Sequence, residues 1–205
     1  MFTKIPKISE VLEALKSLFT KPYTTKFPYK PHQPFPSFRG KPQFFEEKCI
    51  GCGACFQVCP GGAIKLEDFQ DQDGRWFRRL TINYDSCIFC GQCQRNCLTE
   101  EGIKLSSQEY DLSTVEDRGA LKQVIEKELV VCEFCGKPVG CREHILWVAR
   151  RIGPRIFSNP SLFYFVFKDK GLSVKVPPSR RKEVLRQDRI KFLCPHCRRE
   201  SVLIS

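Results

Sequence analysis

The sequence predicts an α+β protein organised around groups of cysteines, and three observations carry this prediction. The chain of 205 residues contains 13 cysteines, an odd number that disulfide pairing alone would leave incomplete. Eight of them form two copies of one four-cysteine run, offset by 38 residues, and four more form two Cys-x2-Cys pairs. Stretches with helical and with alternating apolar spacing lie around these motifs, so both helices and strands are expected.

The N-terminal part is expected to contain an amphipathic helix followed by an extended arm. From Ile8 to Phe19, apolar residues recur at helical spacing with charged residues between them. Pro22–Pro42 then holds six of the fourteen prolines with interleaved aromatic residues, which is typical of an extended, semi-rigid segment. Residues 1–43 are therefore predicted to form a helix and a proline-rich docking arm, with a flexible tail as the alternative.

The strongest pattern is the run Cys-x2-Cys-x2-Cys-x3-Cys, which occurs twice. The first copy consists of Cys49, Cys52, Cys55 and Cys59, and the second of Cys87, Cys90, Cys93 and Cys97. Spacings of three residues place three thiolates on one tight loop, which matches three corners of an iron–sulfur cubane. The fourth cysteine is expected at the start of the following helix, pointing away from its own loop. Zinc ligands or free thiols at these spacings are the alternative.

This motif resembles that of bacterial-type ferredoxins with two 4Fe–4S clusters, in which the fourth cysteine ligates the other cluster. The resemblance implies a ferredoxin domain over residues 44–107. It assigns one cluster to Cys49, Cys52, Cys55 and Cys97, and the other to Cys87, Cys90, Cys93 and Cys59. Leu98 stands where a proline is usual, but no ligand is lost. Because cysteines fill every ligand position and no acid–base pair or nucleophile accompanies them, we assign no catalytic residue and expect single-electron transfer.

The segments beside the second run are predicted to be a hairpin and a connector. Asp73-Gly74 is a strong turn signal between two apolar stretches, and Phe69–Tyr84 is therefore expected to be a β-hairpin insertion. It would serve either as a docking surface or as a bridge between the cysteine runs. Residues 108–131 are predicted to be an acidic connector with a helix over Thr114–Leu129.

A second metal site is predicted in residues 132–205. Cys132-x2-Cys135 and Cys194-x2-Cys197 are the two halves of a tetrahedral four-cysteine centre, although 58 residues separate them. We expect a zinc-ribbon-like domain with one structural zinc ion, or a rubredoxin-like iron in its place. Free thiols, or pairs that ligate separately across a subunit interface, are the alternatives. The remaining cysteine, Cys141, is expected to be a buried free thiol.

Three elements are predicted between these two cysteine pairs. Arg142–Ile152 has the pattern of a helix, Leu162–Phe167 that of a buried strand, and Arg180–Arg189 that of a basic helix.

The positive charge lies mainly at the C-terminal end. Residues 132–205 contain sixteen Lys and Arg against six Asp and Glu, which gives this region a net charge of +10. The whole chain has a net charge of +11. A basic surface suits anionic partners, and we favour a protein-facing surface over nucleic acid. A nucleic-acid-binding iron–sulfur protein is the alternative from another functional class.

Two features bear on the location of the protein. Met1–Ser9 lacks the apolar stretch of a signal peptide, and the longest apolar run, Leu162–Phe167, is far shorter than a membrane span. Together with the metal-like cysteine spacings, these features favour a reducing cytoplasm.

The cysteine runs also carry a resemblance to a family of respiratory proteins. The segment Phe38-Arg39-Gly40-Lys41-Pro42, followed by Cys49-Ile-Gly-Cys52 and Cys87-Ile-Phe-Cys90-Gly, resembles the ferredoxin-type two-cluster subunit of respiratory complex I. It is closer still to the counterpart in formate hydrogenlyase and other group 4 membrane-bound nickel–iron hydrogenases, where paired Cys-x2-Cys motifs follow the ferredoxin domain. The similarity covers Tyr29–Leu105 and, less closely, the C-terminal cysteine pairs.

This resemblance implies an electron-carrier subunit without a substrate site of its own. Electrons would enter from a formate dehydrogenase or a ferredoxin-like donor and leave to the hydrogenase small subunit, and from there reach the large subunit. The protein would be peripheral, on the cytoplasmic side of the cell membrane, with the Ile8–Phe19 helix and the arm contacting membrane subunits or the membrane surface. A complex I-type quinone or ferredoxin oxidoreductase is the alternative within redox chemistry.

Overall fold

The computed structural model describes residues 7–24, 26–27, 29–30, 34–107, 119, 121–172 and 183–203. The chain divides into two compact units, Met1–Pro36 and Ser37–Ser205. The first unit contains helix α1 (Ile8–Phe19), which confirms the predicted amphipathic helix. Its apolar residues, from Ile8 to Phe19, are all exposed. None of the described helices is long and apolar enough to cross a membrane.

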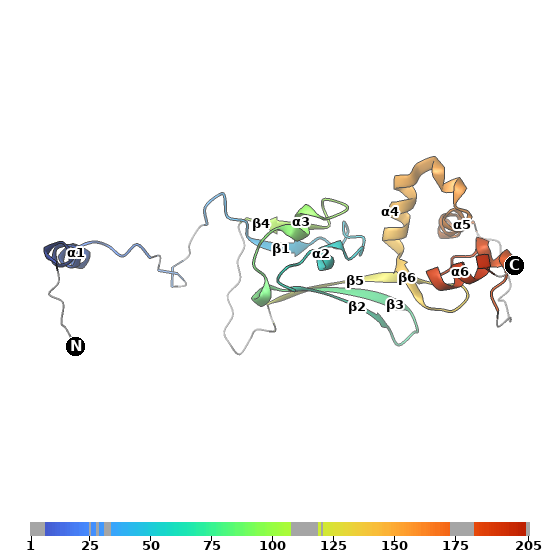
Figure 1. Ribbon diagram of the computed structural model, residues 1–205, viewed down its shortest axis with the longest axis horizontal. Helices are drawn as coiled ribbons and strands as arrows, with labels where there is room; N and C mark the ends of the chain where they lie inside the picture. Colours follow the sequence, from blue (N-terminus) through green and yellow to red (C-terminus); the bar gives the residue numbers. More distant parts are fainter. Residues whose placement is uncertain are drawn as a thin grey trace. The chain divides into compact units, whose positions relative to one another are not determined.

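The second unit begins with two short antiparallel strands that join the two ends of the cysteine-rich region. Strand β1 (Lys41–Phe44) pairs with β4 (Ile103–Ser106), so that Phe44 lies opposite Ile103. Both side chains are buried, at 5% and 2% exposure. The short helices α2 (Ala54–Gln57) and α3 (Gln92–Arg95) pack against each other, with α3 beside β4 and α2 beside β2 (Figure 1).

The predicted hairpin is confirmed as strands β2 (Ile64–Gln70) and β3 (Trp76–Asn83), which the 3-10 helix η1 (Tyr84–Ser86) follows. The Asp71 carboxylate closes the turn by accepting hydrogen bonds from the backbone N–H groups of Asp73 and Arg75. Gly74 has a φ of +79°, a conformation that glycine adopts without steric cost. The hairpin is one half of a four-stranded sheet with the order β2-β3-β5-β6.

The predicted helix over Thr114–Leu129 is wrong where the structure describes it, because β5 (Lys122–Val131) is a strand. Residues 114–118 and 120 lie outside the described residues. Ile125, Lys127 and Leu129 alternate with exposed residues, which is the period of a strand with one buried face. The helical interpretation failed because β3 offers a long edge, and β5 pairs with it from Asn83↔Lys122 to Phe77↔Glu128.

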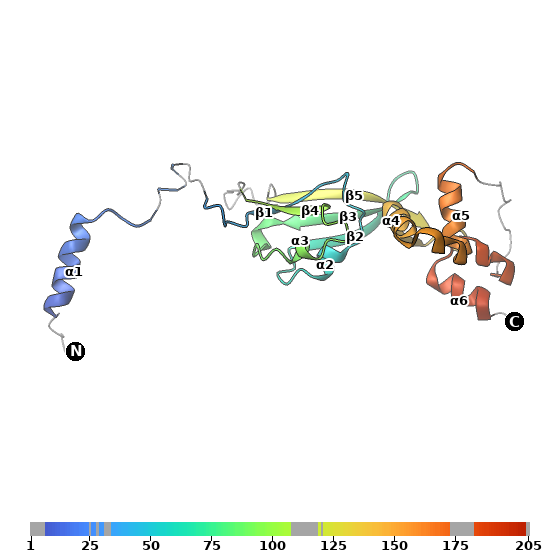
Figure 2. The same cartoon turned by 90° about the horizontal axis from the view of Figure 1, so that it is seen from above.

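Strand β5 continues beyond β3 into the C-terminal part, where it pairs with β6 (Pro138–Cys141). Helix α4 (Arg142–Ile152) follows and confirms the predicted helix. The 3-10 helix η3 (Gly153–Ser158) connects it to α5 (Pro160–Asp169). Figure 2 shows α4, α5 and α6 grouped around the far end of β5.

Helix α5 replaces the buried strand predicted for Leu162–Phe167, so that prediction is wrong. Pro160 stands in the first turn, and the Asn159 side chain accepts a hydrogen bond from the Leu162 N–H at 3.2 Å. These are strong helix-starting signals, and six consecutive apolar residues do not distinguish a strand from a buried helix. Leu162 and Phe165 are buried, whereas Phe163 and Phe167 are about two-fifths exposed.

The end of the chain contains a short 3-10 helix and a terminal helix. The basic helix predicted for Arg180–Arg189 is not present as such: residues 180–182 lie outside the described residues, and the remainder leads into the 3-10 helix η4 (Arg186–Ile190). Helix α6 (Pro195–Leu203) starts immediately after Cys194. Among the described residues, one core of buried side chains lies between the large sheet and α2 and α3, and another surrounds Cys132, Val184, Leu193, Cys194 and Cys197.

Candidate metal centres

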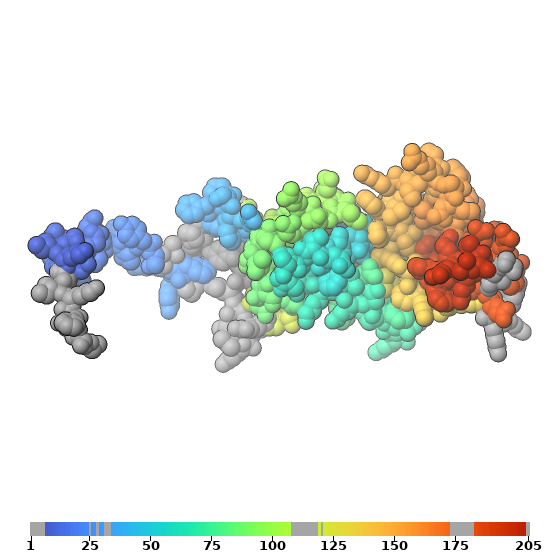
Figure 3. Space-filling model, in the orientation of Figure 1, coloured from blue at the N-terminus to red at the C-terminus, as the bar shows by residue number. Residues whose placement is uncertain are grey.

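Each four-cysteine run folds as a loop that leads into one helical turn. Gly53 and Gly91 immediately precede α2 and α3 with φ of +79° and +78°, and this left-handed conformation turns the loop into the helix. The third cysteine of each run, Cys55 or Cys93, therefore lies on the helix and is buried. The fourth cysteine follows the helix, which corrects its predicted place at a helix start. The two runs lie side by side in the space-filling view (Figure 3).

One cavity brings together cysteines from both runs. Its lining contains Cys49, Cys52 and Cys55 of the first run and Cys97 of the second, with apolar walls that include Phe44, Leu80 and Ile103. Gly102 closes one side, because a Cβ atom there would lie 3.1 Å from Cys49 Cα and 3.3 Å from Cys97 Sγ. The structure therefore places Cys97 with the first three cysteines of the other run.

The second group of thiols has the mirrored composition. Burial raises the pKa of Cys87, and the charges of Cys59 and Cys90 add to this rise. Burial also raises the pKa of Cys93, and the charges of Cys87 and Cys90 act in the same direction. Cys59, the last cysteine of the first run, therefore lies near Cys87 of the second.

The raised pKa values among these thiols are compatible with thiols that ligate a metal cluster. Burial raises the pKa of Cys55 to about 12 and that of Cys93 to about 11, and the neighbouring cysteine charges add to the effect. Several thiolates in one apolar cavity repel one another, and coordination to a metal ion deprotonates such thiols. At Cys97 burial acts in the same direction, but hydrogen bonds from Thr99, Ile103 and Gly102 outweigh it and lower the pKa of this thiol.

Three side chains surround the loop between Cys49 and Cys52, and the sequence analysis singled out only one of them, Cys141. The Gly51 carbonyl accepts hydrogen bonds from Arg78 Nη1 and from the Cys141 thiol, each at 3.2 Å. Lys127 is 9% exposed and donates to the Glu46 carbonyl at 2.6 Å. Cys141 itself is fully buried, and burial raises its pKa to about 12, in line with the predicted buried thiol. Arg78, Lys127 and Cys141 lie 27 to 90 positions from Gly51 in the sequence, so no local pattern could predict that they contact this loop.

The other predicted set is assembled at the C-terminal end. The Sγ atoms of Cys132, Cys135, Cys194 and Cys197 all lie within 4.8 Å of one another, and those of Cys135 and Cys194 are 3.7 Å apart. A tetrahedral zinc ion with Zn–S bonds of about 2.3 Å would separate its sulfur ligands by about 3.8 Å. The four thiols of the two pairs converge without Cys141, and their role as metal ligands stays a prediction.

Backbone amides favour the charged form of Cys132, whereas burial and neighbouring thiols raise the pKa of Cys135 and Cys197. Burial alone would raise the pKa of Cys132, but hydrogen bonds from the backbone of Cys135, Cys194 and Phe134 lower it to about 7. The Cys197 N–H also points at the Cys194 sulfur, at 3.5 Å. His196 neighbours Cys197 but is exposed, and its ring lies 3.6 Å from the Glu200 carboxylate.

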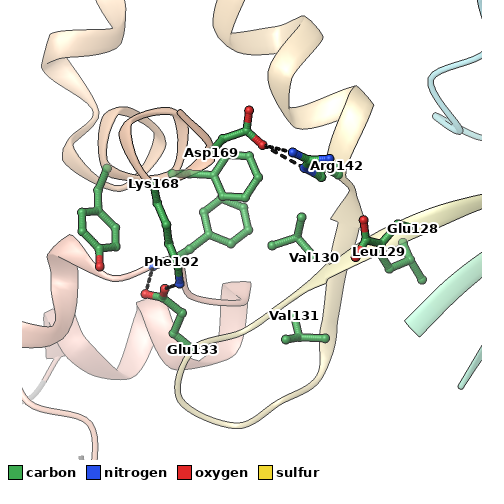
Figure 4. Close-up of a pocket in the computed structure, with 11 residues that line it drawn as sticks. Glu128, Leu129, Val130, Val131, Glu133, Arg142, Lys168, Asp169 and Phe192 are labelled. Atoms are coloured by element: carbon green, nitrogen blue, oxygen red, sulfur yellow. Dashed lines mark hydrogen bonds and ion pairs between the residues drawn. The ribbon is translucent and has the colours of Figure 1, made fainter. Parts of the chain in front are cut away.

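Ion pairs hold this cysteine set against helix α5. Figure 4 shows a pocket between the end of β5 and α5 in which Lys168 reaches Glu133, and Arg142 reaches Asp169. Both pairs have N–O distances of 2.6 Å. Glu133, which lies between Cys132 and Cys135, also accepts a hydrogen bond from the Phe192 N–H at 3.0 Å. The loop with the first cysteine pair is therefore fastened to the segment that leads into the second.

Comparison with known proteins agrees with this geometry. The 4Fe–4S dicluster domain family matches residues 48–100. NADH-quinone oxidoreductase subunit I 2 of Geobacter metallireducens is 36% identical over 114 residues, which covers 53% of this chain and 86% of that protein. Formate hydrogenlyase subunit 6 of Escherichia coli is 34% identical over 146 residues, which covers 71% of this chain and 72% of that protein.

A solved structure is also similar in sequence. A chain of the membrane-bound sulfane sulfur reductase, an archaeal respiratory membrane complex, is 31% identical, with a TM-score of 0.36. The match covers 58% of this chain and 63% of that chain. The match to the 4Fe–4S dicluster family confirms the predicted ferredoxin-type domain, and the zinc-ribbon-like character of the C-terminal part stays a prediction.

The packing around the first loop predicts a selective effect of Gly51→Ala. A Cβ atom at Gly51 would lie 2.5 Å from Cys141 Sγ, whereas one at Gly62 would have nothing within 4 Å. Both glycines have positive φ, so Gly62→Ala carries only the backbone cost of about 1–2 kcal/mol. Gly51→Ala adds overpacking of about 1–3 kcal/mol. Anaerobic thermal unfolding should therefore show the larger loss for Gly51→Ala, and equal losses would contradict the close packing of Cys141 on this loop.

Proposed function

The chain belongs to the family of two-cluster iron–sulfur subunits that includes NADH-quinone oxidoreductase subunit I and formate hydrogenlyase subunit 6, and we propose that it relays single electrons within a membrane-bound complex of this kind. The observation that carries the proposal is the cavity that combines Cys49, Cys52 and Cys55 with Cys97. Two runs that exchange their last cysteine place two clusters next to each other, which is the arrangement a relay needs.

In this proposal one cluster is held by Cys49, Cys52, Cys55 and Cys97, and the other by Cys87, Cys90, Cys93 and Cys59. When bound, such clusters supply one-electron redox chemistry. The protein holds the thiolates, and its apolar walls, among them Leu80 and Ile103, keep water from the first set. Because all ligands are cysteines, neither set offers an open position to a substrate.

For the identity of the complex we favour a formate hydrogenlyase-type, nickel–iron hydrogenase assembly. The match to formate hydrogenlyase subunit 6 extends over 146 residues, well beyond the dicluster domain at 48–100. Electrons would then enter from a formate dehydrogenase or ferredoxin-like donor and leave to the hydrogenase small subunit. The protein would lie on the cytoplasmic side, against the membrane subunits. A complex I-type assembly is the second candidate, since the match to a quinone oxidoreductase subunit has the higher identity.

For the C-terminal set we propose one structural zinc ion. The convergent thiols, the 3.7 Å separation of two sulfurs and the amide hydrogen bonds at Cys132 suit a closed tetrahedral shell. Such a shell has no position for a substrate, so its role is to hold β5, η4 and α6 together. Rubredoxin-like iron is the alternative metal.

The exchanged ligands can be tested by iron analysis of cysteine variants. The wild-type chain, reconstituted without oxygen, should contain about eight irons in its clusters. Cys97→Ser and Cys59→Ser should each weaken a different cluster, because each removes one ligand from the opposite run, and the two variants should leave different electron paramagnetic resonance signals. Cys141→Ser, a buried cysteine outside both sets, should keep all the iron. Identical residual signals in the two variants would contradict the exchange.

The C-terminal site can be tested by metal analysis of the same preparations. Cys194→Ser should lose about one zinc per chain and retain its cluster iron, since its thiolate completes a shell separate from the clusters. Cys141→Ser should retain the zinc. An unchanged zinc content in Cys194→Ser would contradict the assignment, because the ion would then be held by other residues.

The assembly can be tested by purification from the membranes of the native host. We expect a tagged full-length chain to co-purify, in mild detergent, with the small and large subunits of a nickel–iron hydrogenase. Co-purification with quinone oxidoreductase subunits in their place would favour the second candidate. Recovery without any membrane subunit would contradict both.

A further inference from the structure

The two cluster loops are equivalent in backbone but differ in what surrounds them. Gly51 and Phe89 occupy the same position in Cys-Ile-x-Cys, and both have positive φ, +67° and +52°. Gly51 is buried beneath Arg78, Lys127 and Cys141, whereas Phe89 is 38% exposed. The large sheet therefore covers one loop and leaves the equivalent residue of the other at the surface.

A partly buried guanidinium, that of Arg78, donates a hydrogen bond to the first loop. Arg78 Nη1 donates to the Gly51 carbonyl at 3.2 Å, while Nε and Nη2 donate to the two Asp68 oxygens at 2.8 and 2.9 Å. The Arg78 side chain is only 17% exposed. Asp68 partly neutralises the arginine but lies on the far side of the guanidinium, so the pair forms a dipole directed at the loop. Arg78 is also close enough to sense the charge of Cys52.

A second buried cation reaches the same loop from strand β5. A Cβ atom at Gly51 would lie 3.1 Å from Lys127 Cβ, and the charge of Lys127 acts on the Cys49 thiol. Its ammonium group donates to the Glu46 carbonyl, and the Glu143 carboxylate lies 3.9 Å away. That carboxylate is at the limit of an ion pair, so it compensates Lys127 only in part.

The second loop has a cation of a different kind. Arg39 Nη1 donates to the Cys90 carbonyl at 3.2 Å, but this hydrogen bond lies on the exposed surface. Water and salt screen a charge at the surface, whereas buried charges act through a medium of lower dielectric constant. The field at the two loops is therefore unequal.

We propose that Arg78 and Lys127 raise the reduction potential of the cluster held by Cys49, Cys52, Cys55 and Cys97 above that of its neighbour, so that the first electron resides on that side of the pair. Reduction adds one negative charge, which nearby buried cations stabilise. The inference rests on the ligand sets of the proposed function. The two clusters of the relay would then have different reduction potentials, and the difference would come from the cations of strands β3 and β5.

The proposal can be tested by anaerobic redox titration of the full chain, followed by electron paramagnetic resonance. Wild type should show two separate potentials. Arg78→Gln should lower the higher one, because it removes the cation and leaves Asp68 uncompensated. Asp68→Asn should shift the same potential upward, because it leaves Arg78 unpaired. We expect about a tenfold change in the reduction equilibrium for each, which is about 59 mV for a one-electron couple.

A matched control is provided by the next residue on the same strand. Arg79 points to the opposite face of β3 and pairs with Glu126, with Nε 2.8 Å from Oε1. Arg79→Gln should leave both potentials unchanged. Arg78→Lys, which keeps the charge, should retain most of the wild-type value. Lys127→Gln should lower the higher potential independently, and this variant carries the test if Arg78→Gln loses its iron.

Three results would overturn the inference. These are coincident wild-type potentials, shifts of the same sign in Arg78→Gln and Asp68→Asn, or an equal shift in Arg79→Gln. A wild-type protein that assembles two clusters but gives one of these results contradicts the inference alone. A wild-type protein that does not hold two clusters contradicts the proposed function on which the inference rests.

Discussion

The convergence of Cys97 with three cysteines of the first run constrains the central part of the chain. Cys97 can line the cavity of Cys49, Cys52 and Cys55 only if α2 and α3 pack together and the chain then returns along β1 as β4. Gly102 is needed at this return because any side chain would press on Cys49 and Cys97. Short helices and strands of four residues would be marginal by themselves. Their geometry follows from the requirement that distant thiols converge.

Strand β5 connects this region to the C-terminal cysteines. One end of the strand pairs with β3, against the core beneath α2 and α3, and the other pairs with β6 beside Cys132 and Cys141. Cys141 then contacts the Gly51 carbonyl, and Lys127 lies under the same loop. The proposed zinc site and the proposed first cluster are therefore linked through one continuous strand. Lys168 of α5 pairs with Glu133 in the loop of the first cysteine pair, and Arg142 of α4 pairs with Asp169 of α5.

The charges of the molecule are divided between two roles. Several C-terminal cations are paired with carboxylates, as Lys168 is with Glu133 and Lys191 with Asp188, and these pairs shape the fold around the four thiols. Arg78 and Lys127 are different because they are buried beside a cluster loop. Buried charge is costly unless it is compensated, and a group that becomes more negative on reduction is a suitable partner.

The cysteine spacing alone predicted a dicluster domain and a separate group of four thiols, and local signals determined α1, α4 and the Asp73-Gly74 hairpin, because these depend on residues close in sequence. Local patterns failed at β5 and α5. The strand at Lys122–Val131 forms because β3 offers it an edge, and the apolar run at Leu162–Phe167 is helical because of its cap and its packing. The contacts of Arg78, Lys127 and Cys141 with the Gly51 loop join residues far apart in the chain. Only the tertiary structure decides such contacts, because burial and electrostatic environment arise from the pairing of distant strands.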